Sequence, residues 1–383
     1  MDLVRHQVHF LWKGAMRMKV FPLHQMNLEE AKQKQFEFVD AICREFSGYD
    51  VLSLGDLGVR QPLNKPQQTE KVERVLASFF HTEKALLVTG AGTGAIRFGL
   101  TSILPANGTV LVHKAPIYPT TLNTLKGLNA QIIEADYNDL QDIRDVLKDN
   151  KIDCAIVQYT RQKPNDSYDM REVIDTIKSC KDIPVLTDDN YAAMKVPSVG
   201  AELGADLSAF SAFKLLGPEG VGIIVGKAKY IDLIDQQNYS GGGKVQGWQA
   251  MEILRSLVYT PVALAIQAEE NEKIVSELIE SNIPEIKDVF LANSQSKVLL
   301  VEFHEEIAEQ VLREAEKLGA APHPVGSESK YEVVPMFYRV SGTFRKYDPK
   351  FEKSMIRINA MRAGSNTVIR ILKESIKRVK TCS

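Results

Sequence analysis

Short apolar runs alternate with helical segments between residues 85 and 226. The apolar runs have the length of buried strands, and the segments between several of them repeat apolar residues at helical spacing. The predicted strands are 85–88, 109–113, 130–135, 154–159, 184–188 and 221–226, and the predicted helices are 94–104, 119–128, 138–149 and 169–180. This alternation predicts an α/β fold, with a mainly parallel sheet covered by helices on both faces. The last run should be antiparallel, because no crossover helix fits before it.

The segments outside this sheet are predicted to be helical at first and mixed afterwards. Asn27 and Glu30 have capping-box spacing at the start of a helix that runs to about residue 46, and Thr69 is expected to cap a second helix. A long helix over about 247–279, bent at Pro261, leads into a smaller α+β unit. Its predicted strands are 296–303 and 355–360, and its predicted helices are 307–319 and 367–380. We expect an N-terminal arm and helix, a large domain and a small domain, at 1–50, 51–280 and 281–383.

Composition narrows the class of protein. The formal net charge is -2, which argues against general nucleic-acid binding and offers no polybasic patch for a membrane surface. No apolar run has the length of a membrane span. The four cysteines are scattered without a CxxC pair or a His/Cys cluster, so we expect neither a disulfide framework nor a metal site, and a cytoplasmic location. Residues 1–17 are interpreted as a loose arm or an upstream start.

Lys214 stands in a run that is otherwise mostly small, apolar or glycine-rich, SAFSAFKLLGPEGVGIIVG. Burying an ammonium is costly, and a desolvated lysine has a lowered pKa and becomes a nucleophilic amine. Such an amine is suited to Schiff-base chemistry. A lysine that extends its charged end to solvent at a strand end is the alternative.

A glycine-rich turn, VTGAGTGAI, follows the first predicted strand and opens a helix. Its glycines would let the backbone approach an anion, and the helix start offers free N–H groups. The spacing differs from a dinucleotide fingerprint, and the lysine of a Walker loop is missing. The turn therefore predicts a phosphate cradle, with a simple tight turn as the alternative.

Asp188 ends the predicted strand 184–188, at the sheet edge where ligands bind open α/β folds. A buried carboxylate there could hold a ring nitrogen protonated. Capping of the loop by Asp188 or Asp189 is the alternative. A metal site is less favoured, because successive side chains on a strand point to opposite faces.

A phosphate cradle, an acid for a ring nitrogen and a desolvated lysine together are what pyridoxal 5'-phosphate (PLP) requires. From about residue 20 the chain resembles the fold-type I, aspartate aminotransferase-like PLP enzymes. The block FKLLGPEGVGIIVG is similar to the bacterial selenocysteine synthases, and the whole chain is still more similar to the YhfS-type proteins. The resemblance implies a seven-stranded sheet, and a homodimer with its site at the subunit interface.

The resemblance also assigns roles around the cofactor ring. Lys214 matches the Schiff-base lysine. Asp188, in a DxxY pattern with Tyr191, matches the partner of the pyridine nitrogen. His113 matches the side chain that stacks on the ring, although Lys114 is close enough to blur the alignment and a structural histidine is the alternative.

The phosphate group has its own set of matching positions. Gly92 and Thr93 match the phosphate-binding amides, and Gly94 belongs to the same turn. Ser211 matches a phosphate-binding hydroxyl, and Ser208 could do the same one turn away. These five residues are the predicted phosphate ligands within one subunit.

Arginines are the candidates for the substrate. Arg357 resembles the small-domain arginine that binds an α-carboxylate, through a planar group suited to two parallel hydrogen bonds. Arg362 is a nearby competitor. Arg161 could contact the 3-hydroxyl of the cofactor or the substrate. A surface role remains the alternative for these arginines.

Two loops are candidates for contacts across the dimer. Ser240 and Gly241, with Tyr239, lie in NYSGGGKVQG, which resembles a glycine loop that some relatives extend into the neighbouring phosphate site. A flexible loop before a long helix is the alternative. Arg60 and Asn64 lie in a loop that commonly crosses the dimer in relatives.

These observations predict a PLP-dependent enzyme acting on an amino acid or another amine. Elimination or replacement at the β position is favoured, because the nearest resemblance lies in that branch. Transamination is the second possibility, although no NPTG-like motif follows strand 154–159. A PLP-binding protein without turnover and a nucleotide-binding α/β protein are the others. A tRNA substrate is not expected, because no basic N-terminal domain is present.

Overall fold

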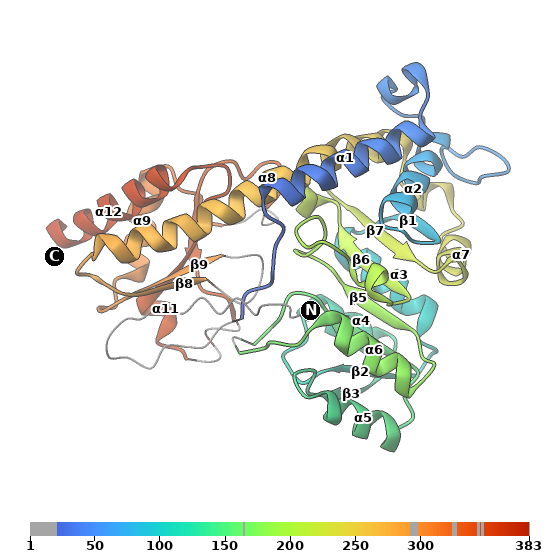
Figure 1. The fold of residues 1–383 in the computed structure, drawn as a ribbon, viewed down its shortest axis with the longest axis horizontal. Coiled ribbons are helices and arrows are strands. Elements are labelled where there is room, and N and C mark those ends of the chain that lie inside the picture. Colours follow the sequence, from blue (N-terminus) through green and yellow to red (C-terminus); the bar gives the residue numbers. More distant parts are fainter. Residues whose placement is uncertain are drawn as a thin grey trace.

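The structure is a computed structural model that describes residues 21–163, 165–291, 298–323, 328–342, 345 and 348–382. Two sheets with their own helices lie at opposite ends of the molecule, and one long helix, α8, runs along both (Figure 1). We refer to the two parts as the large unit and the small unit. Among the described residues, no helix is long and apolar enough to cross a membrane.

The large unit contains a seven-stranded sheet with the order β1-β7-β6-β5-β4-β2-β3. The strands are β1 (Lys84–Thr89), β2 (Thr109–His113), β3 (Gln131–Ala135), β4 (Cys154–Gln158), β5 (Val185–Asp188), β6 (Leu207–Ser211) and β7 (Val221–Gly226). β7 is antiparallel to both of its neighbours, and the other pairs are parallel. This confirms the predicted fold class and the predicted reversal of β7.

Helices cover both faces of this sheet, as the alternating pattern predicts. They are α1 (Leu28–Glu45), α2 (Gln67–Phe79), α3 (Ala91–Ile103), α4 (Pro119–Gly127), α5 (Leu140–Asp149), α6 (Met170–Cys180) and α7 (Ala228–Gln237). The capping box of Asn27 and Glu30 is present at α1. The predicted cap of α2 was wrong, because Pro66 takes that position and the Thr69 hydroxyl donates to the carbonyl of Val245.

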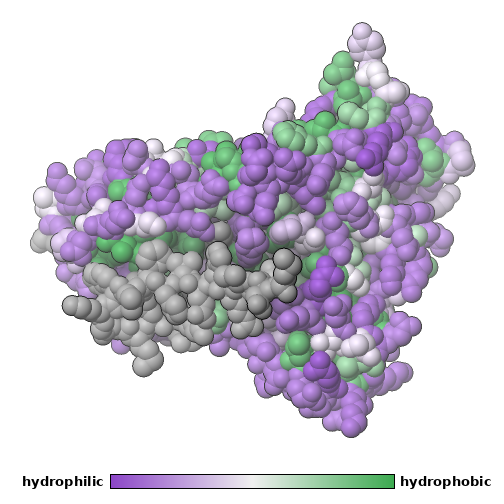
Figure 2. Space-filling view, viewed as in Figure 1, coloured by the Kyte–Doolittle hydropathy of each residue, from purple (hydrophilic) through white to green (hydrophobic). Residues whose placement is uncertain are grey.

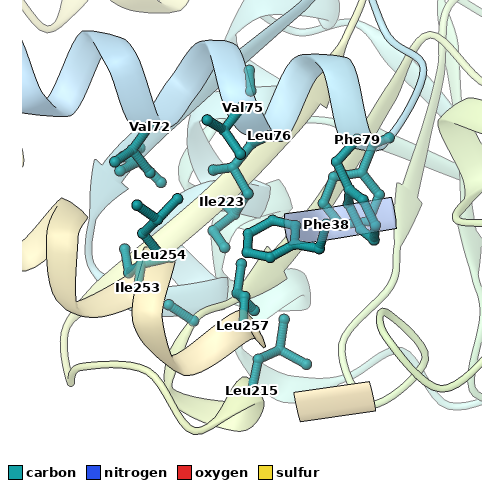
Figure 3. Close-up of a cluster of buried hydrophobic side chains, with 14 of the residues drawn as sticks. Phe38, Val72, Val75, Leu76, Phe79, Leu215, Ile223, Ile253, Leu254 and Leu257 are labelled. Atoms are coloured by element: carbon teal, nitrogen blue, oxygen red, sulfur yellow. The ribbon is translucent and has the colours of Figure 1, made fainter. Parts of the chain in front are cut away.

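A large apolar cluster fills the space between the sheet and helices α1, α2 and α8. Phe38, Leu76, Ile223, Leu254 and Leu257 meet there, each almost fully buried (Figure 3). Burying such a side chain stabilises the fold by about 1.5–3 kcal/mol relative to its exposure. The cluster therefore covers one face of the sheet. Helix α3 and the carboxyl ends of the strands lie outside it.

Helix α8 (Gly247–Ser281) is continuous through Pro261, although proline removes one backbone donor from the helix. The hydroxyl of the preceding residue, Thr260, lies 2.7 Å from the carbonyl oxygen of Leu215. Leu215 directly follows Lys214. The same hydroxyl lies 2.8 Å from the carbonyl oxygen of Ser256, so its one proton is shared between helix α8 and the turn that holds Lys214.

The small unit has a four-stranded antiparallel sheet with the order β10-β11-β9-β8. Its elements are β8 (Ile286–Leu291), β9 (Leu299–Phe303), α9 (Ala308–Lys317), β10 (Met336–Arg339), α11 (Phe351–Ser354), β11 (Met355–Asn359) and α12 (Ser365–Cys382). Helices α8, α9 and α12 pack on one face of it (Figure 1). Sequence reasoning identified β9 and β11 and missed β8 and β10.

Candidate functional site

The ends of β5 and β6 and the start of α3 meet around one side chain, Asn190. Its amide nitrogen donates to Asp188 Oδ1 at 2.7 Å, and its amide oxygen accepts from the backbone N–H of Ser211 at 3.1 Å. A Cβ atom on Gly92 would lie 2.5 Å from the same oxygen. Asn190 therefore joins the three predicted elements of the site, and sequence reasoning did not single it out.

The start of α3 presents backbone donors. Gly90 caps the helix with φ +95°, and the amides of Gly90 and Ala91 donate to Gly220. Among the described residues, no acceptor meets the amides of Gly92 and Thr93. Free N–H groups at a helix start bind anions. The amide of Gly94 is instead used within the helix, so Gly94 serves close packing: a Cβ there would lie 2.1 Å from the Thr89 carbonyl oxygen.

Asp188 lies at the floor of a pocket at the carboxyl ends of the strands. Burial raises the pKa of its carboxyl group, while Asn190 and Lys214 act in the opposite direction. Among the described residues, no cation lies within ion-pair distance of it. The pocket is also lined by His113, Tyr118, Gln158, Gln162 and Tyr168. A buried carboxylate of this kind needs a positively charged partner to offset its desolvation.

Lys214 lies in a tight turn, η3 (Phe213–Leu215), directly after β6. Its Nζ is 3.8 Å from the centre of the Tyr191 ring. Burial lowers the pKa of the lysine, and the charge of Asp188 opposes this. Tyr191 and Leu216, with φ of +66° and +61°, adopt the left-handed conformation that is rare for such residues. Strained turns on both sides of a desolvated amine are typical of functional sites.

His113 lies in the pocket wall, but its ring nitrogens are committed to the chain itself. Nε2 is 3.0 Å from Asp166 Oδ1, and Nδ1 accepts from the backbone N–H of Tyr137 at 3.0 Å. Its ring is stacked on that of Tyr137. Tyr118, 42% exposed at the N-cap of α4, lines the same pocket with a less committed ring. The structure thus supplies a second candidate for stacking that sequence reasoning missed.

Two predicted site residues do not join this group. Ser208 lies three residues before Ser211 and so faces the other side of the sheet, where its hydroxyl bonds Thr187 and the amide of Ala201. Arg161 is buried and donates to the carbonyls of Phe21 and Tyr168, so its guanidinium braces the chain. The structure therefore does not bring either side chain to the Asn190 group, because a residue's position near a strand end does not fix the direction of its side chain.

The two predicted interface loops lie against each other at the surface, away from the Asn190 group. The side chain of Asn64 donates to the carbonyl of Tyr239 at 3.1 Å. A Cβ on Gly241 would lie 3.1 Å from Val59. Ser240 is exposed, and among the described residues no hydrogen bond joins its side chain to the phosphate cradle.

The small unit contributes Arg357 on β11. Its Nε donates to the carbonyl of Arg339 at 2.8 Å, and its guanidinium lies 4.2 Å from the centre of the Tyr338 ring. Arg362 donates instead to Gln267 on α8 at 2.9 Å. The half-buried Arg357 stays on the sheet face opposite α8, α9 and α12, since its neighbours Ile356 and Ile358 pack against those helices.

Two family models cover most of this chain. "Aminotransferase class-V" matches residues 61–255, and "YhfS-like, C-terminal domain" matches residues 272–372. The protein YhfS of Escherichia coli (strain K12) is 51% identical over 362 residues, which are 94% of this chain and 100% of that protein. The chain belongs to the YhfS family of class-V aminotransferase-like proteins.

Solved structures agree with this assignment. The crystal structure of the pyridoxal-5'-phosphate-dependent protein YhfS from Escherichia coli superposes with a TM-score of 0.93 at 51% identity, covering 94% of this chain and 99% of that one. Cystathionine gamma synthase from Xanthomonas oryzae pv. oryzae gives a TM-score of 0.69 at 15% identity, covering 91% and 98%. The second likeness shows the shared fold alone. PLP is the cofactor of this YhfS-family chain.

The residues of the site fit this cofactor. The free amides of Gly92 and Thr93 suit a phosphate group, and the Ser211 hydroxyl has no partner among the described residues. Asp188 is the buried acid that a pyridinium would neutralise. The Lys214 amine lies beside the same group of residues. Among the described residues, no cluster of His, Cys, Asp and Glu could hold a metal ion.

Proposed function

We propose that this protein is a PLP-dependent enzyme that acts on an amino acid or another amine, most simply by elimination or replacement at the β position. The observation that supports it is Lys214, a desolvated amine without an ion-pair partner among the described residues, at the strand ends beside Asp188. An ordinary structural lysine in such a place would be paired.

The roles of the residues follow from their positions. When bound, PLP supplies an electron sink for a carbanion at the substrate Cα. Lys214 would hold the cofactor, and its amine, when free, would take the Cα proton of the substrate on Nζ. Asp188 keeps the ring nitrogen protonated, and the amides of Gly92 and Thr93 anchor the phosphate. Arg357 binds the substrate carboxylate from the small unit.

The reaction class rests on a separate observation. Elimination or replacement is proposed ahead of transamination because the block around Lys214 resembles that of the bacterial selenocysteine synthases. A PLP-binding protein without turnover is the other alternative, because Lys214 and Asp188 would bind the cofactor in either case.

A spectral screen over amino acids and amino sugars tests these alternatives. The protein should be yellow with PLP, and Lys214→Ala should lose that band. Ammonia and a keto acid without conversion of the cofactor indicate elimination, whereas conversion to the pyridoxamine form indicates transamination. A spectrum that no amine changes supports the non-catalytic alternative. A colourless protein that PLP cannot reconstitute would contradict the assignment of Lys214.

A second copy of the chain is the proposed partner, through an exposed apolar surface beside the two interface loops. Tyr49 is 87% exposed and Leu54 81% exposed, and this surface also contains Leu52, Leu57, Val59, Leu63, Tyr239 and Trp248. Figure 2 shows hydrophobic side chains on the projecting segment after α1. Patches of this kind mark interfaces. Sedimentation should give a dimer, and Leu54→Glu with Leu57→Glu should give monomers that bind PLP more weakly.

A further inference from the structure

The ring of Tyr191 faces two ammonium groups. Lys214 Nζ lies 3.8 Å from the ring centre, and Lys195 Nζ lies 5.6 Å from it. We propose that the Tyr191 ring is the docking site of the Lys214 ammonium while that lysine is detached from the cofactor. The inference rests on the proposed function, and it concerns the ring face of Tyr191 rather than its hydroxyl.

The second ammonium is already neutralised, which leaves the ring to Lys214. Lys195 forms a buried ion pair with Glu328, and both side chains are at most 2% exposed. Gln267 donates to the other carboxylate oxygen at 3.0 Å. Among the described residues, Lys214 has no carboxylate within ion-pair distance, so the ring of Tyr191 is the group in contact with its charge.

The interaction has the distance and the surroundings in which it is strong. A cation within about 6 Å of a ring centre is attracted by the ring face, most strongly when water is excluded. Burial lowers the pKa of Lys214 and so disfavours its charged form. Asp188 from β5, Tyr118 from the N-cap of α4 and Glu328 from the small unit act in the opposite direction from farther away. The ring adds stabilisation of the ammonium at short range.

The backbone holds the ring in place. Tyr191 has φ +66°, and the turn is fixed on its N-terminal side by the bonds of Asn190 to Asp188 and Ser211. A tyrosine in this conformation costs about 1–3 kcal/mol, which is maintained only where the surroundings require it. When Lys214 takes a proton, the ammonium therefore meets a preformed acceptor face beside the reaction centre.

The test uses cofactor-free full-length protein and the rate at which Lys214 reacts with added PLP, measured against pH. Only the neutral amine reacts, so the pH midpoint reports the ammonium-to-amine equilibrium. Tyr191→Phe keeps the ring and should leave the midpoint unchanged. Tyr191→Leu and Tyr191→Met replace it with apolar side chains and should shift the equilibrium about tenfold towards the amine, which lowers the midpoint by about one pH unit.

Three outcomes are informative. A wild-type midpoint in both ringless variants, with normal thermal unfolding, would overturn the proposal. An equal shift in Tyr191→Phe would also overturn it, because the hydroxyl would then be the active group. If reduction and mass spectrometry find no PLP adduct on Lys214, the proposed function itself is refuted. This outcome is distinct from an unchanged midpoint, which refutes only the role of Tyr191.

Discussion

Replacing Gly92 with alanine tests the central position of Asn190. The new Cβ would lie 2.5 Å from the Asn190 amide oxygen and 2.8 Å from its nitrogen, distances that real Cβ atoms essentially never show. Asn190 must therefore move, and its bonds to Asp188 and to the Ser211 amide must break or lengthen.

The magnitude follows from the two bonds. A hydrogen bond between neutral groups contributes about 1 kcal/mol and one to a charged group about 1.5–3 kcal/mol. Losing both should destabilise the cofactor-free protein by about 2.5–4 kcal/mol. The bond to Asp188 is stronger when its carboxylate is ionised, as it is opposite a pyridinium. PLP binding should therefore weaken by roughly 1.4 kcal/mol, or about tenfold.

The assay is a PLP titration with thermal unfolding of the cofactor-free protein. Gly99→Ala is the matched control, because Gly99 lies in the same helix and its Cβ would meet only the end of the Leu186 side chain at 3.0 Å. Asn190→Ala provides the second background. Gly92→Ala should cost much less there, since the atoms it strikes are gone.

Equal losses from Gly92→Ala in both backgrounds would refute the reasoning, because the damage would then not pass through Asn190. If the Gly92→Ala variant binds PLP as tightly as the Gly99→Ala variant does, the link to Asp188 is refuted.

Three further predictions concern other parts of the site. Lys195→Met or Glu328→Gln alone leaves an uncompensated buried charge and should cost about 3–5 kcal/mol in urea unfolding, whereas the double variant should lie close to wild type. Burial raises the pKa of Asp189 to about 7, so the folded protein keeps a proton that the unfolded chain loses above its ordinary value of 3.8. Stability should therefore fall as pH rises from about 4 to about 7, and Asp189→Asn should remove that part of the slope in melts across pH; an unchanged slope would contradict the assignment. Arg357→Lys keeps the charge but not the two-donor geometry, so spectral titration should show about tenfold weaker amino-acid binding with unchanged PLP binding; unchanged amino-acid affinity would move the carboxylate site elsewhere.

The sheet was predictable because its strands are buried on both faces, which gives apolar runs that stand out between helices. Gly92, Asp188 and Lys214 came together for a related reason: ligand-binding residues of α/β folds collect at the carboxyl ends of strands. The edge strands β8 and β10 were missed. Only Val289 of β8 is buried, and Lys287 and Asp288 interrupt its apolar residues, so its sequence lacks a long apolar run.

Side-chain direction is the part that spacing did not predict. Ser208 and Ser211 are both serines at a strand end, yet they face opposite sides of the sheet. Arg161 is held by the carbonyl of Phe21, 140 residues away along the chain. Tyr191 reaches Lys214 through a left-handed turn, a conformation that sequence rarely signals for tyrosine. Such contacts depend on tertiary packing, so no local pattern records them.

The bond between Thr260 and the Leu215 carbonyl gives α8 a mechanical role. This helix of 35 residues is about 52 Å long at 1.5 Å per residue, and it is shared by both units. Pro261 places its weak point next to the attachment to the lysine turn. The contact joins α8 to the residue that follows Lys214, next to the proline of the helix. A rotation of α8 near Pro261 should therefore displace the turn that holds Lys214, and Thr260→Val, which removes this contact, should weaken that coupling.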